Sequence, residues 1–292
     1  MYPAPFAYLA PTSIPEAVDS LVDLRDEEPK ILAGGQSLIP LMKLRFAQPA
    51  YVVDINRIAE LRGVRRDDDG GLRIGALTRE RELEDAEVVR QRYPILFDTA
   101  TVIADPLVRN LATVGGNLAH GDPANDHPAT MIALGAEVVA VGPGGARRIP
   151  IEEFFTGLFE TVLEPTEILT QIRIPPPPAG TGAAYVKYER QAGDFAVAGA
   201  AVNLTAVDGV VARARVALTN VGSTPYRAHD VERVLAGRRP SAGDLRAAGA
   251  LAADGLDLYD ELSSPADYKR RVVTAVVARA LARALARAGG WP

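Results

Sequence analysis

Two pairs of adjacent glycines are the places in this sequence where a ligand could reach the backbone. The first pair stands in the run LAGGQS, residues 32–37, and the second about eighty residues later in the run TVGGN, residues 113–117. Glycine has no Cβ and adopts positive φ at little cost, so a ligand can come close to the chain there. Both runs also carry hydroxyl or amide side chains that form hydrogen bonds.

A glycine turn that opens a helix is a common phosphate-binding arrangement, because its N–H groups are unpaired and the helix dipole favours an anion. In the first run Ser37 is expected to cap the following helix, and Pro40 fits its first turn. The dinucleotide motif GxGxxG and the P-loop are both absent. A single such turn is more often structural, whereas two that converge would enclose a diphosphate.

The segment HGDPANDH, residues 120–127, gathers two histidines and two aspartates and therefore raises the alternative of a metal site. Pro123 within it and Pro128 directly after it stiffen the segment, and no third imidazole or thiolate is available to complete a transition-metal shell. We therefore expect no metal ligand. The sequence also shows no nucleophile paired with a base, so no catalytic residue is assigned to the chain itself.

Composition limits the partners. The chain has 292 residues, enough for about two domains, and a net charge of -5 that argues against nucleic acid or anionic lipid as a partner. It has no cysteine, so any iron–sulfur cluster must belong to another chain. The N-terminus lacks the pattern of a signal peptide and no apolar run approaches the ~20 residues of a transmembrane segment, so we expect a cytoplasmic protein.

The elements that must position the two turns follow from hydrophobic periodicity. Helices are predicted over residues 15–26, 38–46, 88–103 with a break at Pro94, and 129–134; strands over 30–33, 51–55, 72–77, 137–141 and 167–174. The charged run at residues 65–69 is interpreted as a solvated turn. The four prolines at 175–178 cannot pair in a sheet and are expected to form a semi-rigid connector.

We place the domain boundary in that proline run, giving domains 1–177 and 178–292. The second domain is predicted to hold strands at 183–189, 196–206 and 210–218, followed by helices at 228–235, 242–253 and 265–288. The last helix has one apolar face. Its arginines are interpreted as a solvated face: Arg270, Arg271, Arg279, Arg283 and Arg287.

Two long runs together resemble the flavoprotein subunit of molybdenum hydroxylases, which is the medium chain of aerobic carbon monoxide dehydrogenase and the middle domain of xanthine dehydrogenase. They are LAGGQSLIPLMKLR, residues 32–45, and IADPLVRNLATVGGNLAHGDPAND, residues 103–126. After the prolines, AYVKYERQAGDFAVAGAAV and VALTNVGSTPYRA resemble that family's C-terminal domain. The resemblance therefore covers nearly the whole chain.

The resemblance implies an α+β fold: a PCMH-type (vanillyl-alcohol-oxidase-like) FAD-binding domain of two α+β subdomains, then a smaller α+β domain with a three-stranded sheet plus helices. FAD would lie between the two subdomains and be noncovalent, since there is no cysteine and there are only three histidines. Gln36 stands where some relatives carry a histidine. The residues implied to bind FAD are Leu32, Ala33, Gly34, Gly35, Gln36, Ser37, Thr113, Val114, Gly115, Gly116, Asn117, Asp126, Leu169 and Lys187.

Three of these residues carry individual roles by the resemblance. Asp126 would accept hydrogen bonds from ribityl or ribose hydroxyls; alternatively it caps a helix near Pro128. Lys187 would lie near the flavin ring, where a cation favours the anionic reduced form; alternatively it is a surface lysine of a strand. Leu169 would form an apolar wall of the site, or be ordinary core.

The function implied is that of an electron-transfer subunit. A large molybdopterin-binding subunit would oxidise the substrate, a small subunit with [2Fe–2S] clusters would pass on single electrons, and FAD in this chain would deliver them to an external acceptor. The assembly would be a dimer of heterotrimers. Two alternatives stay open: a self-sufficient flavin oxidoreductase of the same fold, such as an alcohol oxidase, and a non-redox FAD-binding module.

Overall fold

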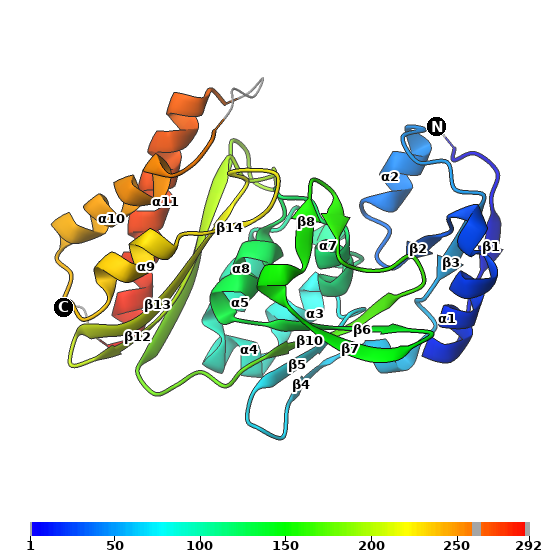
Figure 1. Cartoon of the computed structure of the whole chain (residues 1–292), viewed down its shortest axis with the longest axis horizontal. Coiled ribbons are helices and arrows are strands. Elements are labelled where there is room, and N and C mark those ends of the chain that lie inside the picture. The colour runs from blue at the N-terminus through cyan, green and yellow to red at the C-terminus, as the bar shows by residue number, and fades with distance from the viewer. Residues whose placement is uncertain (1, 259–263, 290–292) are drawn as a thin grey trace.

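Three sections, each with its own sheet and helices, follow one another along the long axis of the molecule (Figure 1). The computed structural model describes residues 2–258 and 264–289. The N-terminal section holds β1 (Ala7–Leu9), α1 (Ile14–Asp23), the short helix η1 (Arg25–Glu27), β2 (Lys30–Leu32), α2 (Leu38–Lys43) and β3 (Tyr51–Asp54). Its strands pair in the order β1-β3-β2, all parallel.

The middle section is built on an antiparallel five-stranded sheet in the order β4-β5-β10-β6-β7. Its strands are β4 (Val64–Arg66), β5 (Leu72–Gly75), β6 (Glu137–Gly142), β7 (Gly145–Pro150) and β10 (Ile168–Ile174), with a separate hairpin of β8 (Phe155–Gly157) and β9 (Glu160–Thr161). Its helices are α3 (Glu80–Asp85), α4 (Glu87–Arg92), α5 (Pro94–Thr101), α6 (Pro106–Arg109), α7 (Val114–Ala119) and α8 (Asp126–Leu134), with the short helices η2 (Ala59–Leu61) and η3 (Ile151–Glu153).

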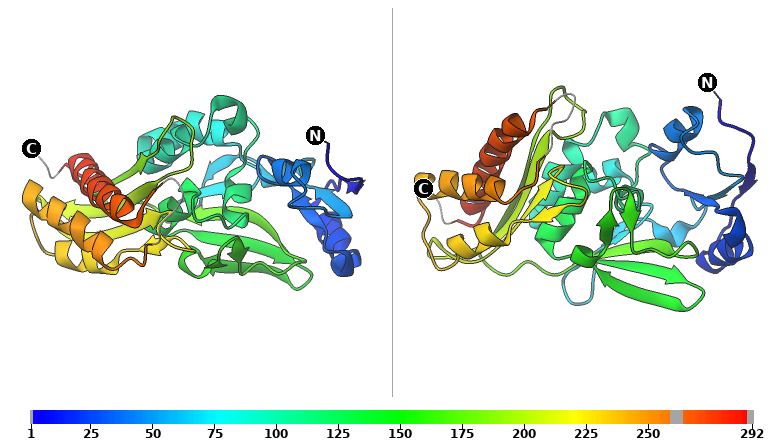
Figure 2. Two further views of the ribbon diagram at one scale, coloured as in Figure 1. Left: turned by 90° about the horizontal axis from the view of Figure 1, so that it is seen from above. Right: turned by 45° about the horizontal axis from the view of Figure 1, so that its top comes forward.

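The C-terminal section is an antiparallel sheet with helices on both faces, as the turned views of Figure 2 show. Its strands are β11 (Thr181–Tyr188), β12 (Ala198–Val207), β13 (Val210–Thr219) and β14 (Tyr226–Arg227), and its helices are α9 (His229–Leu235), α10 (Ala242–Asp254) and α11 (Ala266–Arg287). Helix α11 packs on one face, while α5 and α8 of the middle section pack on the other. No helix of the described residues is long and apolar enough to cross a membrane.

Each section has its own hydrophobic core. The N-terminal core takes Leu77 and Ile168 from segments of the middle section, so the two sections share a seam. In the C-terminal sheet, alternate residues face opposite ways: Ala184 and Val202 join the core under α11, whereas Tyr185 joins the core of the middle section. The middle section is thus held on both sides by apolar packing.

The predicted α+β class and most predicted elements are confirmed. Pro94 ends the predicted helix over 88–103 and starts α5, because its ring fits the first turn of a new helix. The predicted helix over 129–134 begins earlier, at Asp126, because Pro128 is accepted in its first turn. The C-terminal sheet has four strands rather than three, since β14 has only two residues and leaves no alternating pattern.

The interpretation of residues 65–69 as a solvated turn is wrong for Asp67. That side chain is buried, with ion pairs to Arg73 at 2.6 Å and to Arg173 on β10. Burial opposes ionisation, but the two guanidinium groups and the N–H of Asp68 outweigh it and hold the pKa of Asp67 below its usual value. The carboxylate therefore joins the loop to β5 and β10.

We expect Asp67→Asn to lower the free energy of unfolding by about 2 kcal/mol at pH 7, since a buried ion pair is broken. The native pKa is depressed, so the stabilisation is present above the unfolded pKa of about 3.9 and is lost as pH falls through the native value. The gap between the two proteins in urea unfolding should therefore shrink below about pH 4. Asp68→Asn, at the exposed neighbouring residue, is the control; a constant gap at all pH values would contradict the assignment.

The interpretation of the arginines of α11 as a solvated face is also wrong in part. Arg283 and Arg287 form ion pairs with Asp98 of α5 at 2.9 and 2.5 Å, and the Asp98 side chain is 3% exposed. Arg270 donates to the carbonyl oxygen of Ala253 at 2.5 Å. Asp98 lies 189 residues from Arg287 in sequence, so this contact joins the middle and C-terminal sections in a way that helical periodicity does not reveal.

Candidate functional site

The two glycine turns lie against each other at the seam between the N-terminal and middle sections. A Cβ built on Gly34 would stand 2.5 Å from the carbonyl oxygen of Leu111 and 3.1 Å from the backbone nitrogen of Thr113. A Cβ on Gly116 would stand 3.7 Å from the Cβ of Ala33. Gly34 therefore has to be glycine because the second segment passes directly over it.

The first turn offers free donors. Among the described residues, the backbone N–H groups of Gly34, Gly35, Gln36 and Ser37 donate to no other group. Gly35 has φ of 74°, which only glycine adopts readily, and this turns the chain so that α2 begins directly afterwards. Ser37 was expected to cap α2, but its side chain makes no capping hydrogen bond. Its hydroxyl remains available alongside the N–H groups.

The second turn is built differently. Its amides are used within the fold: Gly115 donates to Ala76, and Gly116 and Asn117 donate to the side chain and the carbonyl oxygen of Thr113. A Cβ on Gly115 would meet that of Ala76 at 2.5 Å, so this glycine serves packing. The side-chain oxygen of Asn117 is buried and has no hydrogen-bond partner among the described residues. The second turn can therefore contact a ligand with its side chains, because these backbone N–H groups are already paired within the fold.

Two residues that sequence reasoning missed join the turns. Asn56 donates from Nδ2 to the carbonyl oxygen of Ala33 at 2.7 Å and accepts at Oδ1 from Arg79 Nη2 at 2.7 Å. Arg79 donates through Nη1 to the carbonyl oxygen of Leu111. Burial, with the nearby charge of Arg62, lowers the pKa of the Arg79 guanidinium. These hydrogen bonds fix one turn relative to the other, since they run from Ala33 through Asn56 and Arg79 to Leu111.

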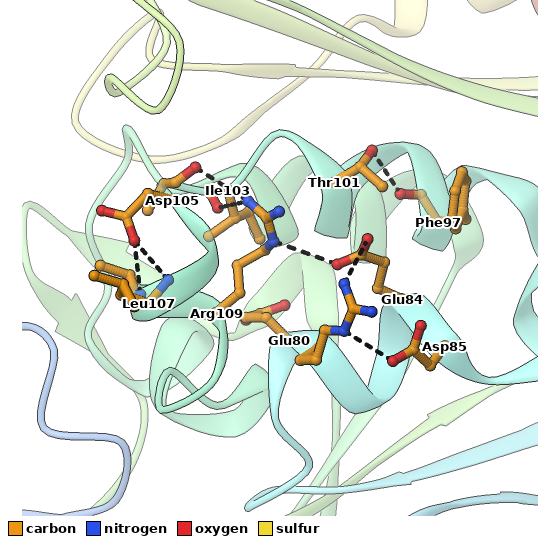
Figure 3. A network of polar contacts seen from close by, with 12 residues as sticks. Glu80, Glu84, Asp85, Phe97, Thr101, Ile103, Asp105, Leu107 and Arg109 are labelled. Carbon is orange, nitrogen blue, oxygen red and sulfur yellow. Dashed lines mark hydrogen bonds and ion pairs between the residues drawn. The ribbon is translucent and has the colours of Figure 1, made fainter.

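A polar network holds the segment that leads into the second turn (Figure 3). Asp105 caps α6 by accepting from the N–H groups of Leu107 and Val108 at 2.7 and 3.0 Å. Arg109, at the end of α6, donates to the carbonyl oxygen of Ile103 at 3.0 Å and lies 3.3 Å from Glu84 of α3. Helix α3 thus anchors α6, and α6 sets where the second turn begins.

Asp126 and Lys187 lie together in a buried cluster between the middle and C-terminal sections. Lys187 Nζ is 3.1 Å from Asp126 and 3.2 Å from Glu189, and donates to the carbonyl oxygen of Val102 at 2.9 Å. Tyr185 donates its hydroxyl to Asp126 at 2.5 Å. Burial raises the pKa of Asp126 although Lys187 and Tyr185 oppose the shift.

This cluster excludes both alternative readings of its residues. The Lys187 side chain is 2% exposed, so it is not a surface lysine. Asp126 is the first residue of α8, and its carboxylate binds Tyr185 and Lys187 instead of capping the helix. With two carboxylates beside one ammonium group, the positive charge of Lys187 is largely compensated. Any effect of this charge on a neighbouring ligand would be correspondingly weaker.

The apolar residues among those named from the sequence as FAD-binding are buried or packed at the first turn. Leu169, on β10, is 5% exposed and belongs to the core of the middle section. Val114 is fully buried at the start of α7. Leu32 ends β2 and packs at the first turn, where its Cδ1 would lie 3.2 Å from a Cβ on Gly35.

The histidines of residues 120–127 have separate partners. His127 Nε2 lies 2.7 Å from Glu80 in a fully buried pair, and His120 packs against the ring of Phe159 at 5.1 Å. Among residues 2–258 and 264–289, no group of three or more His, Asp or Glu side chains is arranged to hold a metal ion.

The donor and acceptor set fits a ligand with an anionic group and hydroxyls. Four free N–H groups beside a serine hydroxyl suit phosphate oxygens, because hydrogen bonds to a charged acceptor are worth about 1.5 to 3 kcal/mol each. The unpaired oxygen of Asn117 requires a donor, which a hydroxyl supplies. Only a ligand that spans the seam reaches both turns.

Comparison with known proteins gives a consistent match. A family described as FAD binding domain in molybdopterin dehydrogenase matches residues 4–177, and the CO dehydrogenase flavoprotein C-terminal domain matches residues 183–284. The carbon monoxide dehydrogenase medium chain of Hydrogenophaga pseudoflava is 44% identical, with 96% of this chain and 97% of that one covered. The caffeine dehydrogenase subunit beta of a Pseudomonas species is 40% identical, with 96% and 95% covered.

A solved structure agrees with these sequences. A chain of the carbon monoxide dehydrogenase from Hydrogenophaga pseudoflava, in a form that lacks the Mo-pyranopterin moiety of the molybdenum cofactor, superposes with a TM-score of 0.95. It is 46% identical, and the match covers 98% of this chain and 99% of that one. The three-section architecture is therefore shared along the whole length.

Proposed function

The chain belongs to the family of the FAD-binding subunits of molybdopterin dehydrogenases, and from this premise we propose that it is the FAD-containing electron-transfer subunit of a molybdenum hydroxylase complex. The observation that supports the proposal is the contact between the two glycine turns, with four unpaired N–H groups on one side and the unpaired Asn117 oxygen on the other. FAD carries a diphosphate and a hydroxylated ribityl chain, which need such groups.

In this proposal the first turn, residues 33–37, binds the diphosphate with its backbone. The second turn contributes the Thr113 hydroxyl and the Asn117 side chain, while Leu32, Val114 and Leu169 supply apolar packing. Asn56 and Arg79 keep the turns at a fixed separation.

 When bound, FAD supplies the two-electron chemistry, accepting electrons and passing them to an external acceptor. The chain's own part is to bind and orient it.

The buried cluster gives the C-terminal section a part in the site. We propose that Asp126 and Lys187 lie at the flavin end of the crevice, Asp126 toward ribityl or ribose hydroxyls and Lys187 toward the ring. Glu189 and Asp126 compensate the charge of Lys187. The cluster would therefore contribute more to positioning the flavin than to shifting the flavin's reduction potential.

The partners follow from chemistry that this chain lacks. It has no cysteine to hold an iron–sulfur cluster, so we propose a small [2Fe–2S] subunit as electron donor and a large molybdopterin-binding subunit that oxidises the substrate. Names such as medium chain and subunit beta among the relatives support membership of a multi-subunit enzyme. We further propose a dimer of heterotrimers in the cytoplasm.

The test is to purify the chain together with the proteins that associate with it in its own cells, and to record the absorption spectrum and metal content. We expect noncovalent FAD in this chain, with iron and molybdenum in its partners, and bleaching of the flavin absorption when substrate is added. Turnover of an organic donor by the isolated chain would favour a self-sufficient oxidoreductase. Flavin that stays oxidised while the clusters are reduced would favour a non-redox module.

A further inference from the structure

A second cavity lies away from the glycine turns, under the proline connector, and we call it the linker groove. Its cavity has a volume of about 150 Å³ and opens to solvent, and the prolines at 175–178 form one side. The remaining walls come from the junction of α4 and α5, the end of α8, and the strands β11, β12 and β13. Pockets for drug-sized ligands measure about 300 to 1,000 Å³, so the groove suits a smaller ligand.

The floor of the groove is polar and is set by strand register. Thr181 pairs with Thr205, which pairs with Arg213 on the next strand. Two residues along, Asn203 pairs with Arg215. Directly paired residues, and residues two apart on a strand, share one face of a sheet. Helices α5 and α8 pack on this same face of the sheet. Further along β11 the face becomes apolar, where Ala183 and Tyr185 join the core of the middle section.

The charge in the groove is positive and incompletely paired. Arg92, Arg213 and Arg215 line it, and no carboxylate does. Arg215 donates to Glu152 and to the carbonyl oxygen of Ile132 at the end of α8, yet its Nε is buried without a hydrogen-bond partner. Among the described residues, the guanidinium groups of Arg92 and Arg213 make no hydrogen bond or ion pair.

The walls beside these arginines are apolar. Tyr93 is 2% exposed and lies in the wall, its hydroxyl 3.4 Å from the carbonyl oxygen of Pro175. Ile95 and the prolines continue that surface. Arginine binds phosphate and carboxylate in a fork of parallel hydrogen bonds, while the proline rings offer an apolar surface to the rest of a small ligand.

We propose that the linker groove binds a small organic oxyanion, with a phosphate or carboxylate group held by Arg213, Arg215 and Arg92 and its apolar part placed against the prolines. The ligand contacts both the middle and the C-terminal sections, because Arg92 and Arg213 belong to different sections. Binding there fastens the two sections together. The site is separate from the crevice between the glycine turns.

The test uses the full-length protein loaded with FAD, so that the crevice is filled, and measures binding by calorimetry. The probes are adenosine 5′-monophosphate, inorganic phosphate, benzoate and, as a neutral control, adenosine. We expect the oxyanions to bind and adenosine not to bind. Arg213→Gln and Arg92→Gln should each weaken binding by about tenfold or more, since a charge-assisted partner is lost. A preference between the two oxyanion classes identifies the group recognised.

Arg246→Gln is the matched control, because this exposed arginine lies on α10, which is not part of the groove. Three results would overturn the proposal: no binding of any oxyanion, binding unchanged in both groove variants, or binding seen only in FAD-free protein. If the chain takes up no FAD, oxyanion binding by the Arg213→Gln and Arg92→Gln variants is still compared with binding by the wild type, and weaker binding by the variants still supports the groove as the site. This proposal and the proposed function therefore fail separately.

Discussion

Gly34→Val is expected to give a folded protein that retains almost no flavin. The new Cβ would stand 2.5 Å from the carbonyl oxygen of Leu111 and 2.9 Å from the Cα of Ala112, closer than real Cβ contacts come, and both atoms belong to backbone. The two segments must separate. Losing two charge-assisted hydrogen bonds to the diphosphate weakens binding by about a hundredfold or more, and flavin absorption per protein after gel filtration measures the loss.

Gly144→Val is the matched control for this variant. Gly144 lies in the turn between β6 and β7, and a Cβ there meets nothing within 4 Å. Its flavin content should equal that of the wild type. A Gly34→Val protein that purifies with full flavin content would refute the placement of the diphosphate between the turns, and circular dichroism of the apoprotein separates this result from unfolding.

Asp98→Asn is expected to cost about 3 kcal/mol of unfolding free energy, the lower part of the range for breaking a buried ion pair, because both arginine partners reach solvent. Asp98 also accepts from the backbone N–H of Tyr185 at 3.3 Å. The substitution removes the carboxylate charge and replaces one of its oxygens with an NH2 group. It therefore weakens the contacts of α5 with both α11 and β11. Urea unfolding at pH 7 measures the difference.

Asp230→Asn provides the comparison with a surface pair. Asp230 and Arg233 are 61% and 76% exposed and lie 2.7 Å apart on α9. Such a pair contributes at most about 0.5 kcal/mol. If the two variants lose similar stability, Asp98 does not join the sections in the way described here.

Local sequence signals predicted most helices and strands and the two glycine turns, whereas the meeting of the turns was implied only by the resemblance to the family. Gly34 and Gly116 are visible because glycine pairs mark turns whatever surrounds them, and Pro94 marks the start of α5 for the same reason. The two turns do lie together. The binding of FAD by the fourteen residues named from the sequence stays a prediction.

The contacts that fix the site depend on tertiary structure and leave no local pattern. Asn56 and Arg79 are 23 residues apart, and neither stands in a recognisable motif. The strand carrying Lys187 alternates like one with a solvated face, yet α8 and the turn before α6 cover that face. Asp67 sits in a run of charges typical of a loop, and only the pairing with Arg173 on β10 shows that it is buried.

The seam between the N-terminal and middle sections has a thermodynamic consequence. Each section brings one turn, and the N-terminal core is small and borrows Leu77 and Ile168 from its neighbour. A ligand that contacts both turns binds only when the two sections are docked, so its binding free energy stabilises the docked arrangement. If the proposed ligand binds there, ligand occupancy and the docking of the N-terminal section are coupled, and we expect the ligand-free protein to lose that docking at a lower urea concentration than the ligand-bound protein.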